Sequence, residues 1–253
     1  MLVIFAVIIG GIATGRLLIG RRLAFVPRLI TVIIWALLFL LGVEVGSDPA
    51  VVGSLATLGG AALAIFALSV AGSIFAAWLL WRRIRGRAVP ADDGEAAADV
   101  PVSAWAALCG SLVIVAFFVV GCVATAVGTL AGAALAAPLL AVWSLTDSLA
   151  VGAGFGYYSL SSIFIADFRG PELATIALLC NVMREIFTLL AAPLVARWCG
   201  PLAAVSIGGA TTFDTTLPII AQAAGRPYAV VSVFHGCVLD FSVPFLVTFF
   251  CTV

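Results

Sequence analysis

Long apolar runs, separated by short polar segments, make up most of the chain. A helix needs about 20 residues to cross about 30 Å of hydrocarbon, and several runs reach that length. They predict membrane-spanning helices at roughly 2–18, 26–46, 53–81, 103–127, 171–199 and 228–252. Two further regions, 129–166 and 201–222, are apolar but interrupted by Gly, Ser, Thr and Pro. The pattern predicts an all-α polytopic membrane protein with about eight transmembrane segments, including broken helices near 145–166 and 201–222.

The composition agrees with this fold class and excludes several kinds of function. Hydrophobic residues make up 64% of the 253 positions and charged residues only 9%, whereas roughly 25% of the residues in soluble proteins are charged. The 12 basic and 12 acidic residues balance, so no net positive field favours nucleic acid. Every basic residue is Arg, which excludes chemistry that depends on a lysine amine.

The arginines predict how the chain crosses the membrane. They cluster between 16 and 28 and again between 82 and 87. Two predicted spans separate the clusters, so both can face the cytoplasm, where basic residues accumulate. We therefore expect an external amino terminus, with the first run a span and not a cleaved signal peptide. The chain divides into an N-terminal three-helix portion, 1–81, a cytoplasmic polar loop, 82–102, and a C-terminal transport portion, 103–253.

A polar stripe crosses the predicted helix at 171–199. Its members, Asn181, Arg184, Glu185 and Thr188, follow the i, i+3, i+4, i+7 spacing of one helix face. Ionisable groups near the middle of a membrane cost about 2.5 to 3.5 kcal/mol each, so they are retained for a partner or a task. An Arg184–Glu185 pair that only locks helices together is one alternative, but adjacent helical residues do not face each other. Another segment must therefore supply partners.

The two interrupted regions predict a substrate site. Gly208 and Gly209 precede hydroxyl residues and Pro218, which weakens a continuous helix and leaves Asp214 at the break. Glycines between 152 and 156 interrupt the other region in the same way. Paired breaks of this kind are the best sequence indication of a transporter binding site. We expect the hydroxyl and backbone groups of five residues to line the cavity: Ser159, Ser161, Ser162, Thr211 and Thr212.

Other polar residues are secondary candidates for the same site. His235 is the single histidine, and a hydrogen bond between helices is its simplest explanation. Asp240 lies deep in the last span, whereas Glu44 lies near a helix end, where water reaches it. Arg184 and Tyr158 complete this group. We predict no catalytic residues, no metal site and no cofactor, and the six cysteines, which form no C-x-x-C pair, fit as small buried hydrophobes.

Four ordered motifs carry a resemblance to a known family. The segments GFGYYSLSSI, NVMREIFTLLAAP, GGATTFDTTLP and VFHGCVLDFSVPFLV, within 145–253, resemble the LysO-type lysine exporters of bacterial inner membranes, and LLFLLGVEVGSD matches more loosely. The resemblance implies export of L-lysine and its toxic analogue thialysine with a pair of essential intramembrane acids, which map to Glu185 and Asp214. Asp240 departs from the family pattern, in which a small neutral residue stands at this position.

These observations favour a secondary transporter, without enzymatic activity, that moves lysine out of the cytoplasm in exchange for protons. The partners would be lysine, protons and the lipid bilayer, and the sequence leaves the choice between a monomer and a homo-oligomer open. Alternatives are a carrier of another cation or organic ion, such as a sodium-proton exchanger, and a non-transporting structural subunit. An intramembrane aspartyl enzyme that uses Asp214 and Asp240 as an acid pair is a further alternative.

Overall fold

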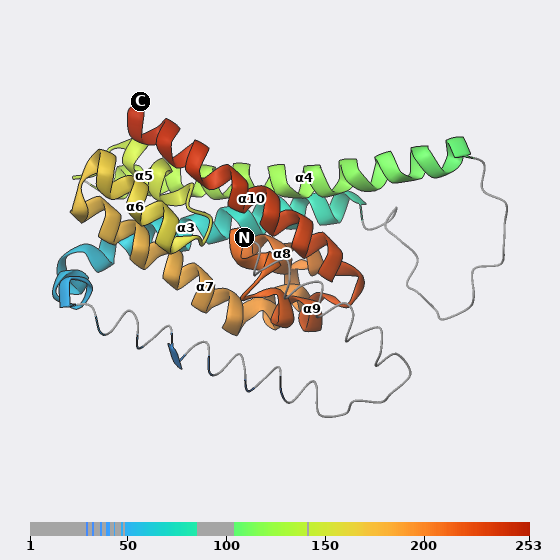
Figure 1. The fold of residues 1–253 in the computed structure, drawn as a ribbon, viewed down its shortest axis with the longest axis horizontal. Helices are drawn as coiled ribbons and strands as arrows, with labels where there is room; N and C mark the ends of the chain where they lie inside the picture. The colour runs from blue at the N-terminus through green and yellow to red at the C-terminus, as the bar shows by residue number, and fades with distance from the viewer. Residues whose placement is uncertain are drawn as a thin grey trace, which may run out of the picture. The chain divides into compact units, whose positions relative to one another are not determined.

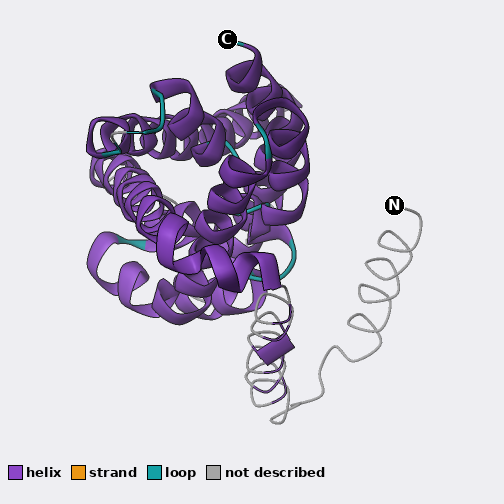
Figure 2. Cartoon of the chain, turned by 90° about the vertical axis from the view of Figure 1, so that its left-hand side faces the viewer, coloured by secondary structure: helices purple, strands orange, loops and turns teal. Residues whose placement is uncertain are grey.

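The computed structural model describes isolated positions between residues 29 and 47, and then residues 49–84, 104–140 and 142–253. Side chains are described from residue 118 onward in the second of these continuous ranges. Within these ranges every regular element is a helix, and short loops join the helices (Figure 2). The prediction of an all-helical membrane protein is confirmed. The predicted spans at 2–18 and most of 26–46 lie outside the described residues, as do residues 85–102 of the polar loop, whose first three residues belong to α3.

Four described helices are long and apolar enough to cross a membrane. They are α3 (Pro49–Ile84), α4 (Ala104–Ala136), α7 (Pro171–Cys199) and α10 (Pro227–Thr252). Proline at the first position of α7 and α10 fits a helix start, since the amide that proline lacks would be unpaired there. Gly200 ends α7 with φ +95°, a conformation that favours glycine.

Helices α3 and α4 pack through glycine. A Cβ on Gly132 would overlap the carbonyl oxygen of Leu68, and one on Gly128 would overlap that of Gly72. Helix α4 therefore continues to Ala136, and the prediction that it ends at 127, before an interrupted region at 129–166, is wrong over 128–136. These glycines permit close backbone approach and do not break the helix.

Two short helices form a hairpin between α4 and α7, which we call hairpin 1. A 3-10 turn, η1 (Ala137–Leu139), leads to α5 (Leu145–Gly152), and α6 (Tyr158–Arg169) follows after a tight turn. Arg169 at the end of α6 lies 3.4 Å from the carboxylate of Asp147 near the start of α5. Hairpin 1 therefore enters and leaves at one end of the bundle, beside the carboxyl end of α10 (Figure 1).

A second hairpin, hairpin 2, lies between α7 and α10. It comprises α8 (Pro201–Gly208), the 3-10 turn η2 (Gly209–Phe213) and α9 (Leu217–Ala224). Its entry and exit both lie near Trp81 of α3, because a Cβ on Gly200 would overlap the Trp81 ring and the Tyr228 ring lies 6.4 Å from it. Hairpin 2 therefore enters from the end opposite to hairpin 1, which we call the Trp81 end.

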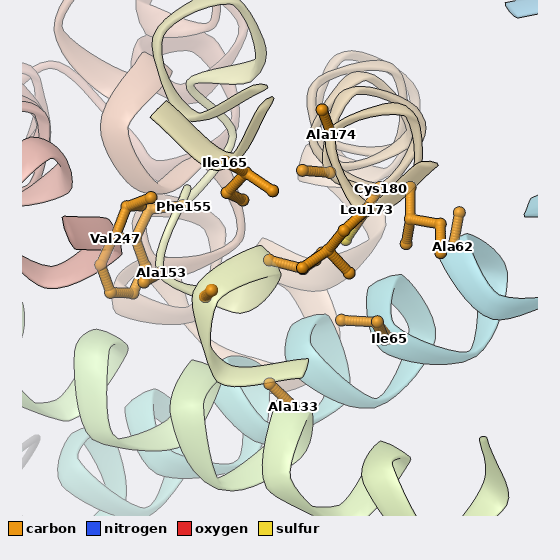
Figure 3. Close-up of a cluster of buried hydrophobic side chains, with 14 of the residues drawn as sticks. Ala62, Ile65, Ala133, Ala153, Phe155, Ile165, Leu173, Ala174, Cys180 and Val247 are labelled. Carbon is orange, nitrogen blue, oxygen red and sulfur yellow. The ribbon is translucent and has the colours of Figure 1, made fainter. Parts of the chain in front are cut away.

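The predicted breaks at 145–166 and 201–222 are confirmed, and each is a hairpin. Eight residues of α8 rise about 12 Å, which is less than half of the hydrocarbon thickness. The two hairpins therefore reach inward from opposite ends without crossing. A buried apolar cluster holds hairpin 1 against the long helices, and Phe155 lies beside Val247 of α10 in it (Figure 3). In the same cluster Ala62 and Ile65 of α3 face Leu173 of α7.

Candidate functional site

The turn of hairpin 1 is held by a side chain of α7. Phe155 and Gly156 adopt φ +47° and +99°, the left-handed region. The amide of Gly156 donates to Asn181 Oδ1 at 2.7 Å, and Asn181 Nδ2 donates to Ser161 Oγ at 3.2 Å. A Cβ on Gly154 would overlap the Asn181 amide. Asn181, predicted in the polar stripe, thus fixes a left-handed turn whose backbone groups would otherwise be unpaired.

The turn of hairpin 2 is held by its own hydroxyl groups. Thr211 Oγ1 donates to the carbonyl of Gly208 at 3.0 Å and lies 3.2 Å from Thr216 Oγ1. Thr216 Oγ1 in turn donates to the carbonyl of Thr211 at 2.9 Å. Both threonines are buried. The threonine hydroxyls therefore bond the carbonyl of Gly208, at the end of α8, and that of Thr211, in η2, where the regular helix has ended.

The two turns meet. The amide of Ala210 donates to the carbonyl of Phe155 at 2.9 Å. Gly209, with φ +59°, lies so close to this carbonyl that a Cβ would overlap it. The two hairpins therefore touch tip to tip near the middle of the bundle. Backbone that is free of helical hydrogen bonds at this depth is the setting in which transporters bind their cargo.

Arg184 of α7 finds its partners on hairpin 2. Its Nε donates to the carbonyl of Ile207 at 2.9 Å, and an Nη donates to the carbonyl of Ser206 at 3.0 Å. Both Nη atoms also lie 3.3 Å from Thr129 Oγ1 of α4. These carbonyls form the carboxyl end of α8, where the helix dipole is negative. The sequence required partners for the polar stripe from another segment. For Arg184 these partners are two backbone carbonyls of hairpin 2 and one side chain of α4.

Three acidic residues lie in or next to this region. Glu185, which follows Arg184 on α7, is 5% exposed. Asp214 ends the turn of hairpin 2, is exposed, and accepts the Thr215 amide on Oδ1 at 2.6 Å. Asp240 of α10 is close enough to Asp214 for their charges to act on each other, and both act on Tyr157 of hairpin 1. A region with several negative charges suits a cation or protons.

The other predicted site residues differ in how far they are buried. Ser161, Thr211 and Thr212 are buried and bond to protein groups, whereas Ser159 is exposed and Ser162 and Tyr158 are half-buried at the start of α6. The predicted lining of a substrate cavity by these hydroxyls stays a prediction. Glu44 lies outside the described residues. The described ranges contain no group of three or more His, Cys, Asp and Glu side chains placed so that they could hold a metal ion.

The interhelical bond predicted for His235 is confirmed. Its Nε2 lies 2.9 Å from Thr125 Oγ1 of α4, and its Nδ1 lies 3.1 Å from Thr212 Oγ1 of η2. The sequence did not indicate Thr125, because it lies 110 residues away in an apolar run.

Comparison with known proteins identifies the family. A family model described as lysine exporter LysO matches residues 5–98 and 102–251, nearly the whole chain. The chain belongs to the LysO family of lysine exporters. The family assignment agrees with the resemblance carried by the motifs around the two hairpin turns and α7. No solved structure matches this LysO chain.

Two curated relatives are similar to this LysO chain over part of its length. A protein of Haemophilus influenzae named putative lysine exporter is 37% identical over 106 residues, which cover 42% of this chain and 54% of the relative. Escherichia coli lysine exporter LysO is 32% identical over 106 residues, covering 42% of this chain and 35% of the relative. The match thus spans about half of one relative and about a third of the other.

Proposed function

We propose that this chain exports L-lysine and thialysine from the cytoplasm in exchange for protons, with Glu185 and Asp214 as the essential carboxylates. The observation that supports the proposal most directly is the meeting of two opposed hairpins at a break that carries Asp214, within a member of the lysine exporter family. The non-helical backbone at the tips suits the zwitterionic part of an amino acid, and the nearby acids suit its side-chain ammonium.

Charge balance favours a cationic cargo. Glu185 and Asp214, when both are ionised, outweigh the permanent charge of Arg184 by one negative charge, and Asp240 adds another in reach of Asp214. A lysine cation or a proton offsets one of these two negative charges. Occupied states are then less costly to move through the low dielectric of the membrane than the empty, charged one.

The membrane potential explains why proton exchange is needed. Moving one positive charge outward against an inside-negative potential costs about 2.3 kcal/mol per 100 mV. One proton entering for each lysine leaving cancels this cost. A carboxylate that releases its proton when it binds the cation, and the reverse, couples the two flows directly.

The location and orientation belong to the same proposal. We infer that the protein lies in the bacterial inner membrane as a multi-pass protein, with the loop at 82–102 cytoplasmic and the amino terminus external. Helix α3 then ends at the cytoplasm, so the Trp81 end is the cytoplasmic end and hairpin 2 enters from it. Hairpin 1 enters from the outside. Each hairpin would cover the cargo from one side of the membrane.

A flux assay tests the proposal. The purified chain is reconstituted into liposomes, and uptake of labelled lysine is followed with and without an imposed pH gradient and with sodium replacing protons. We expect lysine accumulation driven by protons, competition by thialysine and no requirement for sodium. Sodium-driven proton flux without lysine movement would instead identify a sodium-proton exchanger. Absence of any lysine flux from folded protein would refute the proposal.

A further inference from the structure

His235 connects hairpin 2 with α4 through both of its ring nitrogens. It is 3% exposed, and it lies between the hydroxyls of Thr125 on one side and Thr212 on the other. These residues are 1% and 0% exposed. A histidine that only fastens two helices together needs one such bond. This ring has a hydroxyl group, which is both donor and acceptor, at each nitrogen.

The hydrogen bonds continue beyond the ring on both sides. Thr125 Oγ1 donates to Ser206 Oγ at 2.8 Å, and Ser206 Oγ donates to the carbonyl of Ser73 at 3.1 Å. On the other side, Thr212 Oγ1 lies 2.8 Å from the carbonyl of Gly209 and 2.9 Å from that of Ser232. A buried row of hydroxyl groups and one imidazole ring, all with exchangeable protons, therefore connects α3, α4 and α8 with the turn of hairpin 2.

Both neutral forms of the ring are fully bonded in this arrangement. With the proton on Nε2, the ring donates to Thr125 and Nδ1 accepts from Thr212. With the proton on Nδ1, the ring donates to Thr212, whose hydroxyl turns to the carbonyl of Gly209 or Ser232, and Nε2 accepts from Thr125. The bond from Thr125 to Ser206 favours the form with the proton on Nε2. Rotation of the Thr125 hydroxyl toward Nε2, and of the Thr212 hydroxyl toward a carbonyl, permits the other form.

A cavity reaches one side of the ring. Its volume is about 10 Å³, close to the 10 to 15 Å³ that one water molecule needs. Thr125 and His235 are polar lining groups at its inner side, and apolar residues from the Trp81 end form other walls: Ala77, Leu80, Phe118, Leu202, Val205 and Val231. On the opposite side of the ring, Thr212 is followed two residues later by Asp214, which is exposed.

We propose that Thr125, His235 and Thr212 form a proton relay between this cavity and the turn of hairpin 2 that carries Asp214. The relay starts with the proton on Nδ1. A hydronium ion in the cavity gives a proton to Thr125 as Thr125 gives its own to Nε2. The proton on Nδ1 leaves to Thr212, whose own proton passes through water to the carboxylate of Asp214, which becomes a carboxylic acid. One proton enters and one leaves, so the ring ends neutral in its other form.

The relay rests on the proposed proton exchange, and two modes of transport test it separately. Proton-driven lysine uptake requires net proton movement, whereas exchange of labelled for unlabelled lysine at equal pH does not. His235→Gln keeps a hydrogen-bonding group of similar reach but cannot pass a proton between two nitrogens. Thr125→Val removes the hydroxyl at nearly constant volume, and Thr125→Ser restores it. Ser242→Ala is the control, because that hydroxyl lies on α10 and bonds to its own helix at the carbonyl of Leu239, 2.7 Å away.

We expect His235→Gln and Thr125→Val to slow proton-driven uptake about 100-fold or more while lysine exchange continues. Thr125→Ser and Ser242→Ala should keep both modes. Unchanged proton-driven uptake in His235→Gln and Thr125→Val would overturn the relay, and so would loss of both modes in folded protein, which indicates a purely structural residue. A wild-type protein that exchanges lysine without proton-driven uptake would overturn the proposed proton coupling and the relay together.

Discussion

The contacts of Arg184 make the stability of hairpin 2 depend on one side chain. Its guanidinium donates to the carbonyls of Ser206 and Ile207 and reaches Thr129, and the side chain is 3% exposed. Arg184→Met keeps the aliphatic stem and removes all three partners. At about 0.6 to 1.7 kcal/mol for each hydrogen bond inside a membrane, the loss is about 2 to 5 kcal/mol.

The expected result is a lower unfolding free energy of the detergent-solubilised protein, measured by titration with a denaturing detergent. Arg184→Lys should lose less, because an ammonium reaches one carbonyl but not the whole set. Arg82→Met is the control: Arg82 is exposed and lies 4.7 Å above the Trp78 ring, a contact worth about 0.5 to 1 kcal/mol. Equal stability of the Arg184→Met and Arg82→Met variants would refute the assignment of Arg184 as the residue that holds the end of α8.

Two further predictions rest on contacts in the structure, and a third rests on the arginine pattern of the sequence. Gly132→Ile should separate α3 from α4 and lower the melting temperature of purified protein, whereas Gly121→Ala, where a Cβ has open space, should not. Asn181→Leu leaves the Gly156 amide unpaired, at a cost of about 1 to 3 kcal/mol, and should increase hydrogen exchange in 152–157 but not in the middle of α10. A cysteine introduced in 82–102 of a cysteine-free protein should resist impermeant reagents in intact cells, and rapid labelling would overturn the proposed topology.

The sequence predicted the spans and the breaks because both depend on local composition. Apolar length sets a span, and the Gly-Gly-x-Thr-Thr pattern leaves backbone carbonyls that only nearby hydroxyls satisfy. The sequence did not predict the direction of each broken segment. A broken helix that crosses the membrane and a hairpin that turns back to the side it entered from have the same sequence pattern. Asp147 and Arg169, whose ion pair joins the two ends of hairpin 1, become informative only when they are adjacent in space.

Residues that act through distant partners were the hardest to interpret. Gly128 and Gly132 suggested an interruption, yet they serve contact with α3, which no local pattern reveals. The partners of Arg184 are largely main-chain carbonyls. Every residue type carries such a carbonyl, so the sequence does not indicate which ones Arg184 contacts. In the sequence, Thr125 is one of several small residues in an apolar helix. Only the structure shows that it lies next to His235.

The most direct test of the central claim is lysine flux in liposomes containing Glu185→Gln or Asp214→Asn. Each amide keeps the shape of the side chain and removes the charge that is proposed to bind lysine and exchange a proton. Glu172→Gln on α7 and Asp167→Asn on α6 are matched controls, since both carboxylates are exposed near helix ends. We expect proton-driven lysine flux to be abolished in the first two variants and kept in the controls. Wild-type proton-coupled flux in Glu185→Gln and Asp214→Asn would contradict it.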